Sequence, residues 1–142
     1  MNIFLLTYAE VEFIKAELAQ RGFYTEAETH YKKGVQAAIE QLGAVMPATY
    51  FTNSLAAYDG TLERIMLQKY YALYFTDYQQ WFEHRRTGFP KLPTTTAMLN
   101  NAIMPARFSY PTAIQINNEK NYLKAVEMLG PDSINTKVWW DN

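Results

Sequence analysis

The chain has 142 residues, a length that suits one ordinary domain able to bury a sizeable core. Apolar residues make up 49% and aromatic residues 15%, which excludes a chain disordered as a whole, and the 13 basic and 14 acidic residues leave a net charge of −1. The basic pairs Lys32-Lys33 and Arg85-Arg86 make no basic stripe, so nucleic acid is not expected as a partner.

The absence of cysteine excludes disulfides, thiolate metal sites and a cysteine nucleophile. No apolar run reaches the length of a membrane span. The opening MNIFLLTYAEVEF lacks the basic residues that precede the apolar region of a signal peptide. We therefore expect the chain to open inside a helix, as a piece of a longer protein would.

Residues 3–21 are predicted to form the first helix, because apolar residues recur at helical spacing in two stripes. One stripe is Leu6, Ala9, Phe13 and Ala16, and the other is Phe4, Val11, Ile14 and Leu18. Two stripes indicate a helix packed between neighbours. Gly22 supplies a stop, and Thr25 is the expected cap of a second helix over 25–42.

Small residues in both helices, among them Ala16, Gly34 and Ala38, predict closely packed antiparallel helices. The spacing from Gly22 to Gly34, with an aromatic residue and alanine between them, resembles the turn and second helix of a tetratricopeptide repeat. A second copy is not visible, although stacked repeats need neighbours to bury their faces.

Residues 44–60 have no clear periodicity and are predicted to form a loop with at most one short turn. Thr61 can cap a third helical region over 61–90, with a break or bend at Thr76-Asp77 and a stop at Gly88 and Pro90. From residue 91 the composition shifts toward Pro, Thr, Asn and Ser, which predicts an irregular segment with a short strand and one helix at 119–129, capped by Asn118.

The fold class expected from this pattern is all-α, with a tetratricopeptide-like hairpin, further helices and a long irregular C-terminal segment. We expect one domain over 1–142. Its parts are the hairpin at 1–43, the loop at 44–60, the helical region at 61–90 and an irregular wrap at 91–142.

Residues for catalysis or metal binding are not apparent. Glu10 and Glu17 lie seven residues apart on one helix, as solvated helix charges often do. His30 and His84 stand outside any cluster with ligand spacing, and no nucleophile or phosphate-binding motif occurs. The sequence predicts no enzymatic activity and no cofactor.

Aromatic residues suggest sugar binding instead, because tyrosine and tryptophan planes stack on the apolar faces of sugars and neighbouring polar groups bond the hydroxyls. Three groups are candidates: Trp81 with Arg85; Tyr50 with Phe51 and Asn53; and Trp139 with Trp140 and Asp141. Trp81 has helical spacing typical of a core residue, and Arg85 or Arg86 could bond loop carbonyls, Glu83 or Asp77. The loop group Tyr50, Phe51 and Asn53 is the preferred ligand site.

The segment QKYYALYFTDYQQWFEHRRTGFPKL resembles the signature of the SusD/RagB family, the surface nutrient-binding lipoproteins of Bacteroidetes. The matching positions are Gln68-Lys69-Tyr70, Trp81 to Pro90, Arg107 to Pro111, Asn118 to Tyr122 and residues 136–141. The resemblance covers nearly the whole chain, as the C-terminal portion only, because family members are several times longer and begin with a lipidated cysteine.

This resemblance implies a cell-surface protein of the outer membrane that passes oligosaccharide to a TonB-dependent SusC-like transporter. It places the main sugar contacts upstream of this portion, so we expect weak or absent binding by this chain alone. It also implies structural roles for the signature residues, listed as Gln68, Lys69, Trp81, Arg85, Arg86, Gly88 and Pro90.

A helical-repeat scaffold that binds a protein partner remains the alternative function. Because upstream repeats are absent, the stripe of Phe4, Val11, Ile14 and Leu18 should be bare. We expect the chain to self-associate through this first helix.

Overall fold

The computed structural model describes residues 5–141, and over that range the chain contains α-helices, one 3-10 turn and no strand. This confirms the all-α prediction, whereas the short strand expected after residue 91 is wrong. Contacts divide the chain into two compact units, residues 1–91 and 92–142. None of the described helices is both long and apolar enough to cross a membrane.

Helix α1 spans Tyr8–Gln20 and begins at a Thr7 cap, whose hydroxyl accepts a hydrogen bond from the Glu10 amide at 3.1 Å. The first predicted helical residues, 3 and 4, lie outside the described residues, and the described helix starts later than expected. Helix α2 spans Ala27–Gln41. The predicted Thr25 cap is wrong, because the cap position is a left-handed Glu26 and Thr25 lies one residue before it.

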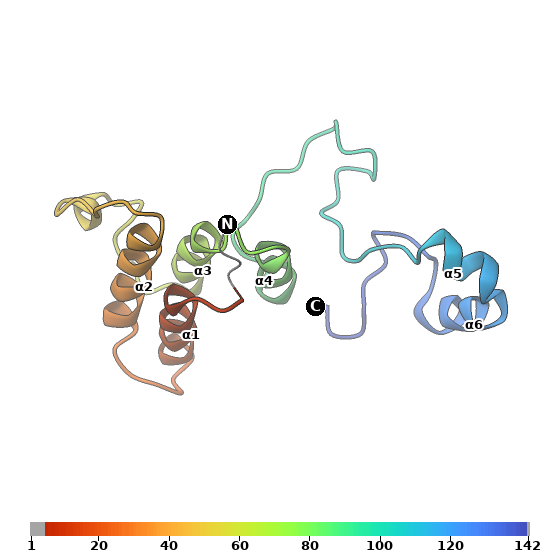
Figure 1. The fold of residues 1–142 in the computed structure, drawn as a ribbon, viewed down its shortest axis with the longest axis horizontal. Coiled ribbons are helices and arrows are strands. Elements are labelled where there is room, and N and C mark those ends of the chain that lie inside the picture. The colour runs from red at the N-terminus through yellow and green to blue at the C-terminus, as the bar shows by residue number, and fades with distance from the viewer. Residues whose placement is uncertain (1–4, 142) are drawn as a thin grey trace. The chain divides into compact units, whose positions relative to one another are not determined.

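Helices α1 and α2 pack side by side as the predicted hairpin, with α3 (Leu62–Ala72) against both (Figure 1). A Cβ atom on Gly34 would lie 3.1 Å from the Phe13 ring, so the two helices meet at a glycine. The buried core consists of Phe13, Ala16, Tyr31, Val35, Ile65 and Met66.

The second apolar stripe of α1 is only partly covered. Ile14 is 38% exposed and Leu18 is 40% exposed, while Val11 is half-buried and Phe4 lies outside the described residues. The hairpin therefore buries one face of α1 and leaves the opposite one accessible within this unit.

The loop at 44–60 contains the short 3-10 turn Tyr50–Thr52 and is tied to the hairpin by Tyr31. The Tyr31 hydroxyl donates a 2.6 Å hydrogen bond to the carbonyl of Ala56. This contact holds the loop beside α2 and α3, where it forms one side of the site described below.

The region 61–90 forms two helices, α3 and α4 (Gln79–Thr87). The predicted Thr61 cap is confirmed, because its hydroxyl accepts from the Arg64 amide at 3.1 Å. The predicted break is also present: the Thr76 hydroxyl bonds the Leu73 carbonyl, and Asp77 has a φ of +51°. Gly88 ends α4 with a φ of +72°, a conformation that glycine adopts at little cost.

The second unit holds helices α5 (Thr112–Asn117) and α6 (Glu119–Leu129). The position of α6 was predicted, but α5 was not, since prolines and polar residues around it suggested extended chain. Asp132 organises this unit: its carboxylate accepts hydrogen bonds from Arg107 Nη2 at 3.1 Å, the Tyr110 amide at 3.1 Å and the Tyr122 hydroxyl at 3.3 Å.

Candidate functional site

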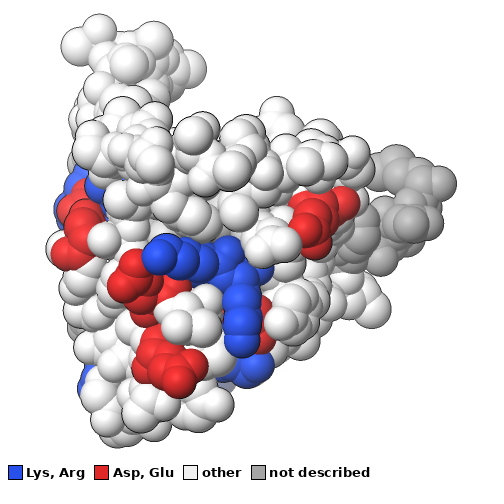
Figure 2. All heavy atoms as spheres, turned by 90° about the vertical axis from the view of Figure 1, so that its left-hand side faces the viewer, with Lys and Arg blue, Asp and Glu red and all other residues white. Residues whose placement is uncertain are grey.

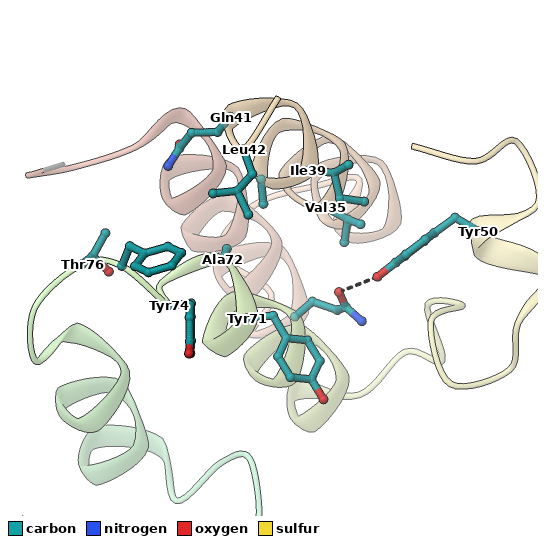
Figure 3. A pocket seen from close by; sticks show the side chains of 12 residues that line it. Val35, Ile39, Gln41, Leu42, Tyr50, Tyr71, Ala72, Tyr74 and Thr76 are labelled. Carbon is teal, nitrogen blue, oxygen red and sulfur yellow. Dashed lines mark hydrogen bonds between the residues drawn. The ribbon is translucent and has the colours of Figure 1, made fainter. Parts of the chain in front are cut away.

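Two adjoining hollows lie on the first unit, around α2, α3 and the 3-10 turn. The first, called the narrow hollow, has a volume of about 120 Å³ and lies between α2 and α3 (Figure 3). It is lined by Val35, Ala38, Ile39, Gln41, Leu42, Tyr50, Gln68, Tyr71, Ala72, Tyr74, Phe75 and Thr76. Its walls are mostly apolar because α2 and α3 both turn aliphatic or aromatic side chains toward it.

The second, called the wide hollow, has a volume of about 650 Å³ and lies between the 44–60 loop and α3. It is lined by Pro47, Thr49, Tyr50, Thr52, Asn53, Leu55, Ala56, Leu67, Gln68 and Tyr71. Hydroxyl and amide groups among these residues give it more polar character than the narrow hollow has.

Tyr50, Gln68 and Tyr71 line both hollows and form their shared wall. Figure 3 shows Tyr50 reaching toward α3, where its hydroxyl donates a hydrogen bond to Gln68 Oε1 at 3.3 Å. Gln68 is buried, whereas Tyr71 is 57% exposed. The shared wall thus combines a fixed polar pair with an accessible aromatic ring.

The predicted ligand group is divided by the structure. Tyr50 lines both hollows and Asn53 lines the wide one, where its Oδ1 accepts a 2.9 Å hydrogen bond from the Leu55 amide. Phe51 instead packs on the core, with its ring centre 6.1 Å from that of Tyr31. The structure therefore brings Tyr50 and Asn53 together at one surface and turns Phe51 inward.

Gln68 and Tyr71 were not predicted as ligand residues. Gln68 has a predicted structural role as part of the signature, and the sequence analysis gives Tyr71 no role of its own. Their spacing of three residues places them on neighbouring positions of α3, which was the available signal. The loop that faces them lies outside α3, so the spacing did not show what they border.

The charged signature residues form a network. Lys69, almost fully buried, donates to Glu83 Oε2 at 2.9 Å. Arg86 contacts both Glu17 oxygens, at 2.8 and 2.6 Å, and also Glu83 at 2.8 Å. This is the expected pairing of Arg86 with Glu83, extended to a carboxylate of α1.

The network controls the charge state of its carboxyl groups. Burial by itself would raise the pKa of Glu83, but Arg86 and Lys69 outweigh it and hold this pKa below its usual range. Glu10 differs, because burial raises its pKa more than nearby Lys69 lowers it. The cluster is thus a set of mostly compensated charges at the junction of α1, α3 and α4.

The remaining signature residues have packing contacts. The Arg85 guanidinium lies 4.6 Å from the ring centre of half-buried Trp81. Pro90 is buried, and its carbonyl lies 3.1 Å from His84 Nδ1. None of these residues lines either hollow.

The other histidine, His30, also has a structural role. His30 is buried in the hairpin, with Nδ1 2.7 Å from Glu12 Oε2. Across residues 5–141, no group of three or more acidic, histidine or cysteine side chains is placed to hold a metal ion.

The candidate tryptophan pair near the C-terminus lies in the second unit. Trp139 is 93% exposed and Trp140 is 40% exposed, and the Asp141 amide bonds the Val138 carbonyl. These aromatic rings are accessible and belong to the second unit, whereas the two hollows belong to the first.

Comparison with known proteins gives a consistent family signal. Residues 1–111 match a SusD-like family model described as "starch-binding associating with outer membrane". A solved structure described as a Bacteroidetes AC2a SusD-like protein is similar with a TM-score of 0.88 and 27% identity, over 98% of this chain and 30% of that one.

Two further solved structures are similar. One, described as a chitin-binding protein, has a TM-score of 0.81 and 33% identity, over 95% of this chain and 32% of that one. The other, a chitin-binding SusD homolog from Flavobacterium johnsoniae, has a TM-score of 0.87 and 25% identity, over 99% of this chain and 37% of that one. The chain thus spans about a third of the length of these structures. A search of the curated proteins found no match.

Proposed function

Because this chain belongs to the SusD-like family of starch-binding proteins that associate with the outer membrane, we propose that it is part of a cell-surface protein that captures oligosaccharides. The family match over residues 1–111 is the observation that carries the proposal. Chitin-binding proteins among the similar structures support a sugar polymer as the ligand class.

In this proposal the wide hollow supplies the sugar contacts of this part of the protein. The exposed ring of Tyr71 offers a plane for the apolar face of a sugar, and the hydroxyl and amide groups of Thr49, Thr52 and Asn53 offer hydrogen bonds to its rim. A hollow of about 650 Å³ falls within the range of small-molecule sites.

The captured oligosaccharide would pass to a TonB-dependent SusC-like transporter, and the longer parent protein would reside at the outer membrane and provide further sugar contacts. A binding role also agrees with how the carboxylates are used: Glu17 pairs with Arg86, and the Glu10 carboxylate accepts a hydrogen bond from the backbone of Thr7, the cap of α1. On the face drawn in Figure 2, acidic and basic side chains lie beside one another, as suits a neutral ligand better than nucleic acid.

Titration with chitotetraose and maltotetraose, followed by NMR chemical shifts, tests this proposal. We expect shifts at Tyr50, Asn53 and Tyr71 and a dissociation constant of about 1 mM. A small number of contacts supplies little binding free energy beyond the cost of association. Tyr71→Ala should abolish the shifts, while Trp81→Ala should preserve them.

Two results would contradict the proposal. The first is an absence of site-specific shifts with either sugar at about ten times that concentration. The second is binding that is lost in Trp81→Ala and retained in Tyr71→Ala, which would place the site elsewhere.

A further inference from the structure

We propose that the narrow hollow is a subsite for an acetamido substituent, so that the protein prefers N-acetylated glycans to unsubstituted ones. This inference rests on the proposed function and specifies its ligand. It stands on the shape and lining of the narrow hollow, and on the way in which this hollow joins the wide one.

The two hollows adjoin at Tyr50, Gln68 and Tyr71, which line both. A sugar ring stacked on Tyr71 in the wide hollow therefore has a substituent position within reach of the narrow one. The wide hollow offers the larger space, about 650 Å³ against about 120 Å³, and so suits the ring, while the narrow hollow suits a substituent.

The size and lining of the narrow hollow fit a methyl-bearing group. Its volume is about 120 Å³, and an apolar cavity of roughly 150 Å³ can hold a benzene molecule. Val35, Ile39 and Ala72 provide aliphatic walls from α2 and α3 (Figure 3). An acetamido methyl buried there leaves water, which is favourable in proportion to its area.

A polar partner for the acetamido carbonyl stands at the boundary. Gln68 Oε1 accepts from the Tyr50 hydroxyl, while the Gln68 amino group makes no hydrogen bond to any described residue and keeps its donor capacity. A sugar hydroxyl in the same place would bury no methyl group against Val35, Ile39 and Ala72, so it would gain less free energy on leaving water. The narrow hollow thus favours an acetamido substituent over a hydroxyl group.

Charged substituents do not fit. None of the residues that line the two hollows is a lysine, arginine, aspartate or glutamate. A sulfate, carboxylate or ammonium group would lose water there without gaining a counter-charge. The lining therefore selects a neutral substituent.

Calorimetric titration with chitotetraose and cellotetraose tests the inference, because these ligands share a β-1,4 backbone and differ at the C2 substituent. We expect chitotetraose to bind roughly fourfold more tightly, the effect of burying about one methyl group. Ala72→Leu fills the narrow hollow and should reduce this ratio to about one while cellotetraose binding persists. Ala44→Leu, at an exposed position outside both hollows, should keep the ratio.

The outcomes separate this inference from the proposed function. Equal affinity for the two ligands in the unaltered protein would overturn the acetamido subsite and leave sugar capture standing. Binding of neither ligand, nor of maltotetraose, would refute sugar capture and the subsite with it. Should Ala72→Leu fail to fold by circular dichroism, the ratio in Ala38→Val decides: a value unchanged from that of the unaltered protein would also overturn the subsite.

Discussion

At the scale of single residues, the signature segment serves mainly to hold helices together. Lys69, Glu83 and Arg86 satisfy one another in a partly buried network that also includes Glu17 on α1. In the sequence alone, basic side chains of this kind suggest a ligand-binding site. In the structure their charges are already compensated, so their mutation should affect stability more than sugar binding.

Glu17 should make the stability of the first unit dependent on pH. Burial by itself would raise the pKa of Glu17, but Arg86 and Arg21 outweigh it and hold this pKa below its usual range. A carboxyl whose folded pKa is lowered stabilises the fold above its unfolded pKa of about 4.3, and this contribution is lost as pH falls through the folded value. Glu10, whose pKa is raised by burial, acts in the opposite direction.

We therefore expect Glu17→Gln to lower the free energy of unfolding by about 1–2 kcal/mol at pH 7, a range reduced because the Arg86 side chain is 43% exposed. The difference from the unaltered protein should shrink as pH falls below about 4. Urea unfolding at several pH values measures both effects, with exposed Glu127→Gln as the control. A difference independent of pH would show that the ion pair is not its cause.

At the scale of elements, the hairpin depends on the close approach of α1 and α2. Gly34 faces the fully buried ring of Phe13, and a Cβ atom there would lie 3.1 Å from the ring, so the ring would have to shift by a few tenths of an ångström. Helix propensity alone would favour alanine over glycine at this position by about 1 kcal/mol. Packing opposes that preference, which explains why a helix interior retains glycine here.

Gly34→Ala should destabilise the hairpin by about 1 kcal/mol net, because overpacking costs about 1–3 kcal/mol and exceeds the gain in helix propensity. In a Phe13→Leu background the same change should be neutral or stabilising, since the smaller side chain leaves room. Urea unfolding of the four proteins in this double-mutant cycle measures the coupling. Strict additivity of the two changes would refute the proposed contact.

At the scale of the whole molecule, the accessible face of α1 is the feature that bears on self-association. Ile14 and Leu18 are partly exposed beside a hollow that is lined otherwise by the charged side chains of Glu10, Glu17, Arg21, Lys69, Glu83 and Arg86. An apolar strip of this kind is a candidate contact for another helix, and a second copy of the chain can supply one. Self-association through α1 remains our proposal for the isolated chain.

Leu18→Lys should therefore shift the chain toward monomer by placing a charge in that contact. Sedimentation velocity over a range of protein concentrations measures the change. Leu55→Lys, which adds the same charge at a position that is 73% exposed in the 44–60 loop, should leave association unaltered. A monomer at every concentration before mutation would contradict the proposal.

The all-α class, the Thr61 cap, the break near Asp77, the Gly88 stop and helix α6 could all be predicted from the sequence. Each depends on local rules, namely helical periodicity, side-chain caps and the backbone freedom of glycine. The prediction of the Thr25 cap failed because the chain adopts a left-handed conformation at Glu26, which takes the cap position. Helix α5 was missed because the prolines and polar residues around it suggested extended chain. The family resemblance was also visible in the sequence, because its motifs are short and stand in order along the chain.

The candidate site was decided by tertiary structure. Adjacent Tyr50 and Phe51 look equivalent in the sequence, yet Tyr50 borders both hollows and partly buried Phe51 packs against the core beside Tyr31. Glu17 and Arg86 are 69 residues apart and meet at hydrogen-bond distance. Such outcomes depend on how α2, α3 and the 44–60 loop pack, and local sequence patterns carry no information about the distances between elements far apart in the chain.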